Sequence, residues 1–161
     1  MIEKNEDSFF IHSLADVNTP HIGSRTRVWQ YSVIMTEVYI GQNCNIGSHT
    51  FIENNVRLGD NVTIKNGVFL WDGITLENDV FVGPNVTFTN DKYPRSKEYK
   101  ESYQKITVKN GASIGANCTI LGGVVIGEKA MIGAGSIVTK DIPSGELWVG
   151  SPARFVRKIE E

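Results

Sequence analysis

The sequence lacks the features that several protein classes require. No apolar run approaches the roughly 18 residues of a membrane-spanning helix. The N-terminus, MIEKNEDSFF, has neither the basic nor the apolar segment of a secretion signal, so we expect a cytoplasmic protein without membrane contact. A formal net charge of −2 and a pI near 5.9 give no general attraction to a polyanion, so no nucleic acid partner is expected.

Cysteine and histidine are also scarce. The 161 residues include two cysteines, Cys44 and Cys118, and three histidines, His12, His21 and His49. Both cysteines occupy the small inward position of the repeat described next, so we expect buried, reduced thiols that pack as small hydrophobes. No metal is expected.

What the sequence does contain is a repeat of six residues. Every sixth position from Ile22 to Phe88 is a large apolar residue, and the pattern resumes from Val108 to Val138. Four residues after each of these comes a small or β-branched residue, such as Thr26, Cys44 or Ala112. A glycine often follows the large residue directly, where turns need backbone freedom.

A period of six with many β-branched residues excludes an amphipathic helix and predicts stacked short parallel strands. We therefore expect an all-β, single-domain parallel β-helix over residues 1–161, with three hexads per coil and about six coils. The final segment SPARFVRKIEE is predicted to form a short capping helix at about residues 151–160.

The hexads IGQNCN, IGSHTF, LGDNVT, IGANCT and IGEKAM, followed by IGAGSIVTKDIPSGELWVGSPAR, resemble those of hexapeptide-repeat acyltransferases. The resemblance implies a left-handed β-helix, a homotrimer with active sites between neighbouring helices, and acetyl-CoA as co-substrate. The stretch ending in TNDKYPRSK resembles the branch that N-acylates nucleotide-linked amino sugars. It is closest to the acetyltransferases of dTDP-3-amino-3,6-dideoxyhexoses in bacterial surface-glycan synthesis.

Residues 89–107 interrupt the repeat with polar, charged and aromatic residues. A loop of this length in a compact domain is usually functional or disordered. Because Tyr93, Tyr99 and Tyr103 can pack, we predict a structured arm that reaches over a neighbouring subunit. The arm would enclose a cleft beside Trp71 and Asp72.

The O-acetylating branches of this family use a histidine near the start of the arm as base, but no histidine follows Asp91 here. The pKa of a protonated sugar amine should be about 7.7 to 8.0. A useful fraction of the amine is therefore already neutral, and it needs a weaker base than a sugar hydroxyl does. Asp91 could orient the amine or act as base, Asn90 could hold it, and His49 could relay the proton. The departing thiolate of coenzyme A is a further alternative.

Binding of a nucleotide sugar requires cations for the diphosphate and an aromatic surface for the nucleobase. Arg95 and Lys97 are the predicted phosphate or sugar contacts, since the arginine fork can bind two phosphate oxygens. Trp29, Trp71 and Tyr93 are candidates for stacking on the base. For acetyl-CoA, we expect a groove along the last two coils, with the following contacts: Gly115, Ala116, Gly133, Ala134, Lys140 and Arg154.

Several alternatives remain open at this point. Within the enzyme class, the acceptor could be a UDP-linked amino sugar, or the reaction could be O-acetylation of a small sugar. A more remote alternative is a γ-type carbonic anhydrase, which shares the fold but needs three histidines around zinc. A non-catalytic β-helix is the last alternative.

Overall fold

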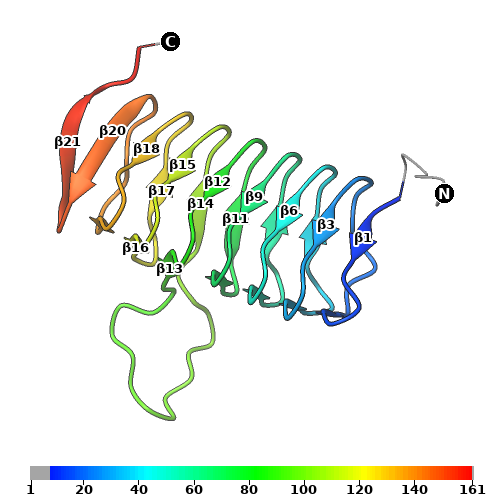
Figure 1. Cartoon of the computed structure of the whole chain (residues 1–161). Helices are drawn as coiled ribbons and strands as arrows, with labels where there is room; N and C mark the ends of the chain where they lie inside the picture. The colour runs from blue at the N-terminus through cyan, green and yellow to red at the C-terminus, as the bar shows by residue number, and fades with distance from the viewer. Residues whose placement is uncertain (1–7, 161) are drawn as a thin grey trace.

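The computed structural model describes residues 8–160, which wind into a parallel β-helix with three flat faces. Figure 1 shows the coils stacked from β1 at the N-terminal end to the β20–β21 hairpin at the C-terminal end. Each face is one sheet, and successive strands move from one sheet to the next around the coil. The core therefore runs as a column along the axis.

The sheets, called A, B and C here, contain nine, seven and five strands. Sheet A contains β1 (Phe10–Ile11), β3 (Arg27–Val28), β6 (Asn45–Ile46), β9 (Thr63–Ile64), β12 (Phe81–Val82), β15 (Ser113–Ile114), β18 (Met131–Ile132), β20 (Glu146–Gly150) and β21 (Ala153–Lys158). Sheet B contains β2 (Asp16–Val17), β4 (Val33–Ile34), β7 (Phe51–Ile52), β10 (Phe69–Leu70), β13 (Thr87–Phe88), β16 (Thr119–Ile120) and β19 (Ile137–Val138). Sheet C contains β5 (Tyr39–Ile40), β8 (Arg57–Leu58), β11 (Ile74–Leu76), β14 (Ile106–Val108) and β17 (Val125–Ile126).

The predicted inward positions form the core. Every large residue of the repeat from Val28 to Val138 is buried, and Ile22 is partly buried. The small positions four residues later are buried as well, including Thr26, Cys44 and Cys118. Both cysteines are free thiols, as predicted. The six-residue period therefore identified the packing of almost the whole helix.

The corner residues of the coil recur every six positions, and many of them have a positive φ, in the left-handed backbone region. Asn43, Asn61 and Asp79 follow one another up a single corner with φ between 55° and 60°. Asparagine and aspartate tolerate this conformation better than most residues. Their side chains also form a ladder, since Asn43 donates to Asn61 (2.8 Å) and Asn61 donates to Asp79 (2.9 Å). The polar corner residues thus join adjacent coils.

The arm leaves the helix between β13 and β14, at the corner between sheets B and C (Figure 1). Paired residues of adjacent coils are normally 18 positions apart, as in Phe51 and Phe69, whereas Thr87 pairs with Thr119 at a separation of 32. The arm therefore adds 14 residues to one coil. The strands on either side keep their pairing, so the insertion leaves the stack intact.

The helix is longer than the predicted six coils. All strands of sheet A except β21 are parallel, which gives eight successive levels. The first level, β1 and β2, precedes Ile22. The repeat did not reveal this level, because Val17 and Ile22 are five residues apart instead of six.

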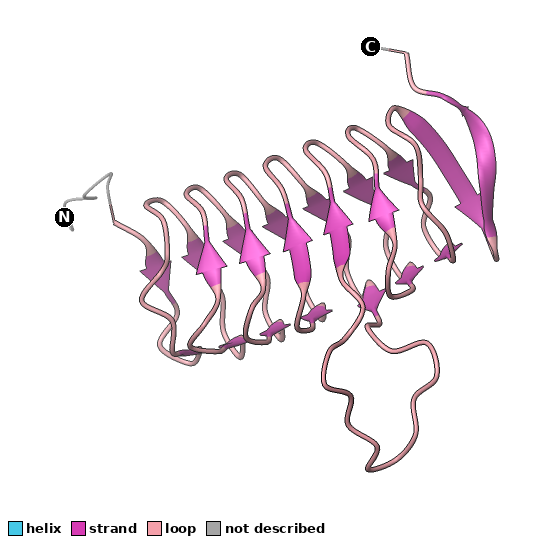
Figure 2. Cartoon of the chain, turned by 180° about the vertical axis from the view of Figure 1, so that it is seen from behind, coloured by secondary structure: helices cyan, strands magenta, loops and turns pink. Residues whose placement is uncertain are grey.

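The predicted C-terminal helix is wrong. Strands β20 and β21 instead form an antiparallel hairpin that ends sheet A (Figure 2). Both segments contain aromatic and β-branched residues that favour strands, Trp148 and Val149 in β20 and Phe155 and Val156 in β21. Among residues 8–160 there is no helix that is long and apolar enough to cross a membrane.

Candidate active site

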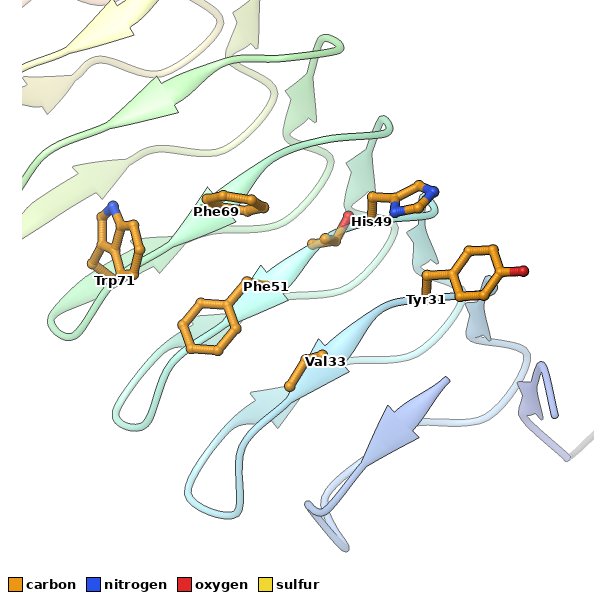
Figure 3. Close-up of a pocket in the computed structure, with 7 residues that line it drawn as sticks. Tyr31, Val33, His49, Phe51, Phe69 and Trp71 are labelled. Atoms are coloured by element: carbon orange, nitrogen blue, oxygen red, sulfur yellow. The ribbon is translucent and has the colours of Figure 1, made fainter. Parts of the chain in front are cut away.

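The outer surface of sheet B carries an apolar hollow of about 390 Å³ (Figure 3). It is lined by Tyr31, Val33, His49, Thr50, Phe51, Phe69 and Trp71. Val33, Phe51 and Phe69 are the outward residues of the paired strands β4, β7 and β10. The hollow is therefore a ladder of outward side chains across three coils, and its surface suits a flat or apolar group.

One end of the hollow is formed by two stacked rings, Tyr31 and His49, with centroids 5.0 Å apart and planes at 30°. Both residues lie at the corner between sheets A and B with positive φ, 61° for Tyr31 and 55° for His49. Other positions on this corner are Gly67, Asn85 and Asn117, the usual residues for this conformation. Both rings are thus held at backbone positions that bulky residues rarely occupy.

Trp71 forms the opposite end of the hollow, close to the root of the arm. Its indole N–H donates to the carbonyl of Phe88 (2.9 Å), the last residue of β13. Its ring packs against Phe51 and Phe69, with centroid distances of 5.6 and 6.0 Å. Trp71 therefore contacts the last residue before the arm, within its own chain.

Asp72, predicted beside Trp71, turns its carboxylate toward the preceding coil. It accepts a hydrogen bond from the Asn55 side chain (3.3 Å), while its own N–H donates to the Glu53 carboxylate (2.8 Å). These bonds join two coils at the corner between sheets B and C. Asp72 is not among the residues that line the hollow.

Asn90 and Asp91 follow directly at the start of the arm. The Asn90 carbonyl accepts from the Gln104 N–H (3.1 Å). Asp91 forms an ion pair with Lys100 and accepts from the Tyr93 N–H (2.8 Å). The Lys100 hydrogen bond, followed by that of the Tyr93 N–H, lowers the pKa of Asp91 below the ordinary aspartate value. A carboxylate with a lowered pKa is a weaker base, so these contacts favour a structural use of this side chain.

The tip of the arm carries Tyr93, Arg95 and Lys97, all exposed. Tyr93 is 78% exposed, and the Arg95 guanidinium donates to the neighbouring Pro94 carbonyl. None of these residues lines the sheet B hollow of its own chain. In both views the arm projects away from the stack (Figures 1 and 2). A single chain therefore does not bring the tip and Trp71 into one cleft.

Trp29 lies on sheet A, on a different face from Trp71. Its indole N–H donates to Asn45 (2.9 Å), and its ring meets Phe10 edge-on at 5.7 Å. It borders a second, smaller hollow of about 200 Å³ together with Lys65. Within one chain the two tryptophans cannot bind the same ring.

The residues predicted for acetyl-CoA lie in adjacent coils at the C-terminal end. A Cβ on Gly115 would lie 2.6 Å from the Ala134 nitrogen, and one on Gly133 would lie 2.4 Å from Val149. The small size of these glycines is therefore already required for coil stacking. Lys140 lies over the Trp148 ring at 5.2 Å, and Arg154 is exposed on β21.

Tyr31, Phe51 and Phe69 were not predicted as site residues, although the sequence contains a signal for them. With three hexads per coil, residues 18 positions apart share a face, as Val33, Phe51 and Phe69 do. Tyr31 and His49 have the same spacing. No group of three or more potential metal ligands occurs among residues 8–160.

The comparisons with known proteins agree with this architecture. Residues 19–54 and 105–140 match the family described as bacterial transferase hexapeptide (six repeats). The chain is 58% identical over 154 residues to the dTDP-3-amino-3,6-dideoxy-α-D-galactopyranose 3-N-acetyltransferase of Aneurinibacillus thermoaerophilus. That alignment covers 96% of this chain and 80% of the relative. The chain therefore belongs to the hexapeptide-repeat transferases.

Two solved structures share the fold. A hexapeptide-repeat acetyltransferase of Vibrio cholerae, complexed with acetyl-CoA, has a TM-score of 0.66 at 27% identity, with 76% of this chain and 71% of that chain covered. A perosamine N-acetyltransferase mutant of Caulobacter crescentus, in complex with CoA and GDP-perosamine, has a TM-score of 0.58 at 22% identity. Its alignment covers 95% of this chain and 58% of that chain, and it supports the fold alone.

Proposed function

We propose that this protein transfers an acetyl group from acetyl-CoA to the 3-amino group of a dTDP-3-amino-3,6-dideoxyhexose, for use in bacterial surface-glycan synthesis. The observation that carries the proposal is the 58% identity, over nearly the whole chain, to an enzyme named for this reaction on the galacto sugar. The reaction would take place in the cytoplasm, with no metal, membrane or nucleic acid partner.

The acceptor site is proposed to lie between neighbouring helices of a homotrimer. The arm of one chain has exposed cations and tyrosines that its own helix does not use, and the hollow of sheet B is an exposed aromatic surface. Bringing a neighbour's arm near this hollow would join the two halves that one chain keeps apart. The aromatic rings would hold the pyrimidine, and Arg95 and Lys97 would bind the diphosphate.

The acetyl-CoA site is proposed along the last coils of sheet A. Exposed Lys140 and Arg154 supply positive charge near the C-terminal end, where the nucleotide phosphates of the cofactor would bind. Gly115, Ala116, Gly133 and Ala134 have side chains no larger than a methyl group, and small residues allow a pantetheine arm to approach a backbone closely. Because coil stacking also requires these glycines, the proposal for this site rests mainly on the family.

The chemistry is a single acyl transfer. The neutral amine nitrogen attacks the thioester carbonyl, a C–N bond forms, the C–S bond breaks, and coenzyme A leaves as the thiolate. Asn90, two residues beyond the carbonyl that Trp71 holds, is proposed to orient the amine. The nitrogen then loses one proton, and two acceptors are proposed: the departing thiolate, and His49, which lies at the opposite end of the hollow from Trp71 and would receive the proton through a relay.

A thiol-release assay with acetyl-CoA tests the proposal. The acceptors are the galacto and gluco epimers of dTDP-3-amino-3,6-dideoxyhexose, a UDP-linked amino sugar, and maltose. We expect release with a dTDP-linked amine, and acetylation of nitrogen confirmed by mass spectrometry. Release only with the UDP sugar would change the proposed substrate to a UDP-linked amino sugar. Release only with maltose would identify an O-acetyltransferase. No release with any acceptor would contradict the proposal.

His49→Asn separates the two proton acceptors. If His49 takes the proton, turnover should fall by about 10²- to 10⁴-fold, the usual contribution of a general base. If the thiolate takes it, turnover should change little. Light scattering of the purified protein tests the trimer independently of activity.

A further inference from the structure

The two legs of the arm are joined at two successive levels just outside the helix. At the inner level, the Gln104 N–H donates to the Asn90 carbonyl (3.1 Å). At the outer level, Asp91 pairs with Lys100, which lies nine positions away on the returning leg. We call these four residues the neck of the arm, and residues 92–99 its tip.

The tip has few contacts of its own. Its internal hydrogen bonds are a weak one from the Glu98 N–H to the Arg95 carbonyl (3.3 Å) and the bond from Arg95 to Pro94. Tyr99 is 87% exposed, and every residue of the tip is exposed. A segment with so little packing takes its orientation from the points where it is anchored. The neck is that anchor.

Asp91 is better shielded than its partner in the neck. Its side chain is 14% exposed, against 45% for that of Lys100. One carboxylate oxygen accepts from both Lys100 and the Tyr93 N–H, so it ties the outgoing leg to the returning leg and to the first turn of the tip. Both hydrogen bonds that the carboxylate accepts therefore come from residues of the arm.

We propose that Asp91 and Lys100 form a clasp that orients the arm tip toward the nucleotide sugar, and that Asp91 is a positioning residue rather than the base of the reaction. The kinetic part of this inference rests on the proposed function. The structural part does not, because it concerns only the order of the tip.

The kinetic test uses Asp91→Asn, Lys100→Met and the double variant, with Asp91→Glu and Lys100→Arg as conservative replacements. Each single variant should raise KM for the dTDP sugar by about two- to fivefold, the range for loss of an exposed ion pair. KM for acetyl-CoA and kcat should stay unchanged, and the double variant should be no worse than either single one. The conservative variants should retain wild-type KM.

A catalytic base at Asp91 would give a different result. Asp91→Asn would then lower kcat by 10²-fold or more, while Lys100→Met would leave kcat unchanged. That pattern overturns the clasp. Lys92→Met and Glu101→Gln, which remove one exposed charge each from the same arm, are the matched controls and should behave as wild type.

A second measurement requires no substrate. Chymotrypsin cleaves after Tyr99 and Tyr103 of the arm, which all these variants retain, but not after Tyr93, which precedes a proline. Cleavage of the assembled protein should be several times faster in Asp91→Asn and Lys100→Met than in the wild type and the two controls. Equal rates in all variants would overturn the clasp even if the acetyltransferase reaction is confirmed, and faster cleavage would support it even if no acceptor is found.

Discussion

The Trp71 indole N–H donates a 2.9 Å hydrogen bond to the Phe88 carbonyl, at the point where the chain leaves the stack. This bond connects the aromatic hollow of sheet B to the root of the arm. Trp71 therefore serves two parts of the candidate site, as a wall of the hollow and as a support for the segment that carries Asn90 and Asp91.

Replacing Trp71 with phenylalanine should loosen the arm root. The variant keeps an aromatic ring but loses the bond to Phe88, at a cost of about 1 kcal/mol. Hydrogen exchange should accelerate in peptides containing Gln104 and Gly122, whose N–H groups bond to Asn90 and Thr89. Trp29→Phe is the matched control, since it also loses an indole hydrogen bond but lies on sheet A. Equal acceleration in both variants would contradict the assignment.

Gly115→Ala should destabilise the helix by about 1–3 kcal/mol, as expected for overpacking. The new Cβ would lie 2.6 Å from the backbone nitrogen of Ala134, so two coils would have to separate. Gly135→Ala has no neighbour within 4 Å and is strained only by its φ of 71°. Its cost should be about 1–2 kcal/mol, and Gly135→Asn should cost less. Urea denaturation measures the three values, and similar losses for Gly115→Ala and Gly135→Asn would contradict the stacking argument.

Both cysteines should be unreactive in the folded protein. Burial raises the pKa of each thiol, which reduces the thiolate needed for alkylation. Each thiol also lies close to a carbonyl oxygen of the next coil, Gly59 for Cys44 (3.2 Å) and Gly133 for Cys118 (3.1 Å). Iodoacetamide at pH 8 should therefore modify neither cysteine until denaturant is added, and then both. Rapid modification of native protein would show that the coils open locally.

The clasp should withstand mild acid. Because the pKa of Asp91 is lowered in the folded protein, the ion pair contributes fully above the ordinary aspartate range and is lost as the pH falls through the lowered value. Pepsin works in this range and cleaves at aromatic residues. Wild-type cleavage at the arm should approach that of Asp91→Asn only at the acidic end of a series from pH 5 to 2. A transition at or above the ordinary aspartate pKa would contradict the lowered value.

The period of six predicted the core because each inward residue stacks on a residue 18 positions away, whatever the outer surface does. It missed the first coil, because Val17 and Ile22 are five residues apart instead of six. It also gave no information about β21, which lies beyond the last coil and forms an antiparallel hairpin with β20. The candidate site was harder to predict. Trp29 and Trp71 are 42 positions apart, which is not a multiple of 18, so they lie on different faces, although residue type alone made both of them candidates for stacking on the nucleobase.

The sequence showed where the arm interrupts the repeat, but it did not predict the direction in which the arm projects. The contacts that anchor it, such as Trp71 to Phe88 and Asp91 to Lys100, join residues whose spacing follows no repeat. Its orientation depends on a few local polar bonds rather than on burial, and a hydrophobic pattern contains no information about such bonds.

The terminal hairpin has a consequence for the behaviour of the protein at high concentration. A column of parallel strands resembles a short piece of fibril, since its open end offers backbone groups on which another copy could continue the ladder. Here the last strand, β21, runs in the opposite direction and presents Arg154, Arg157 and Lys158 to solvent. A strand of another copy could extend the ladder only beside these exposed cations, which protects this end of the column from strand addition.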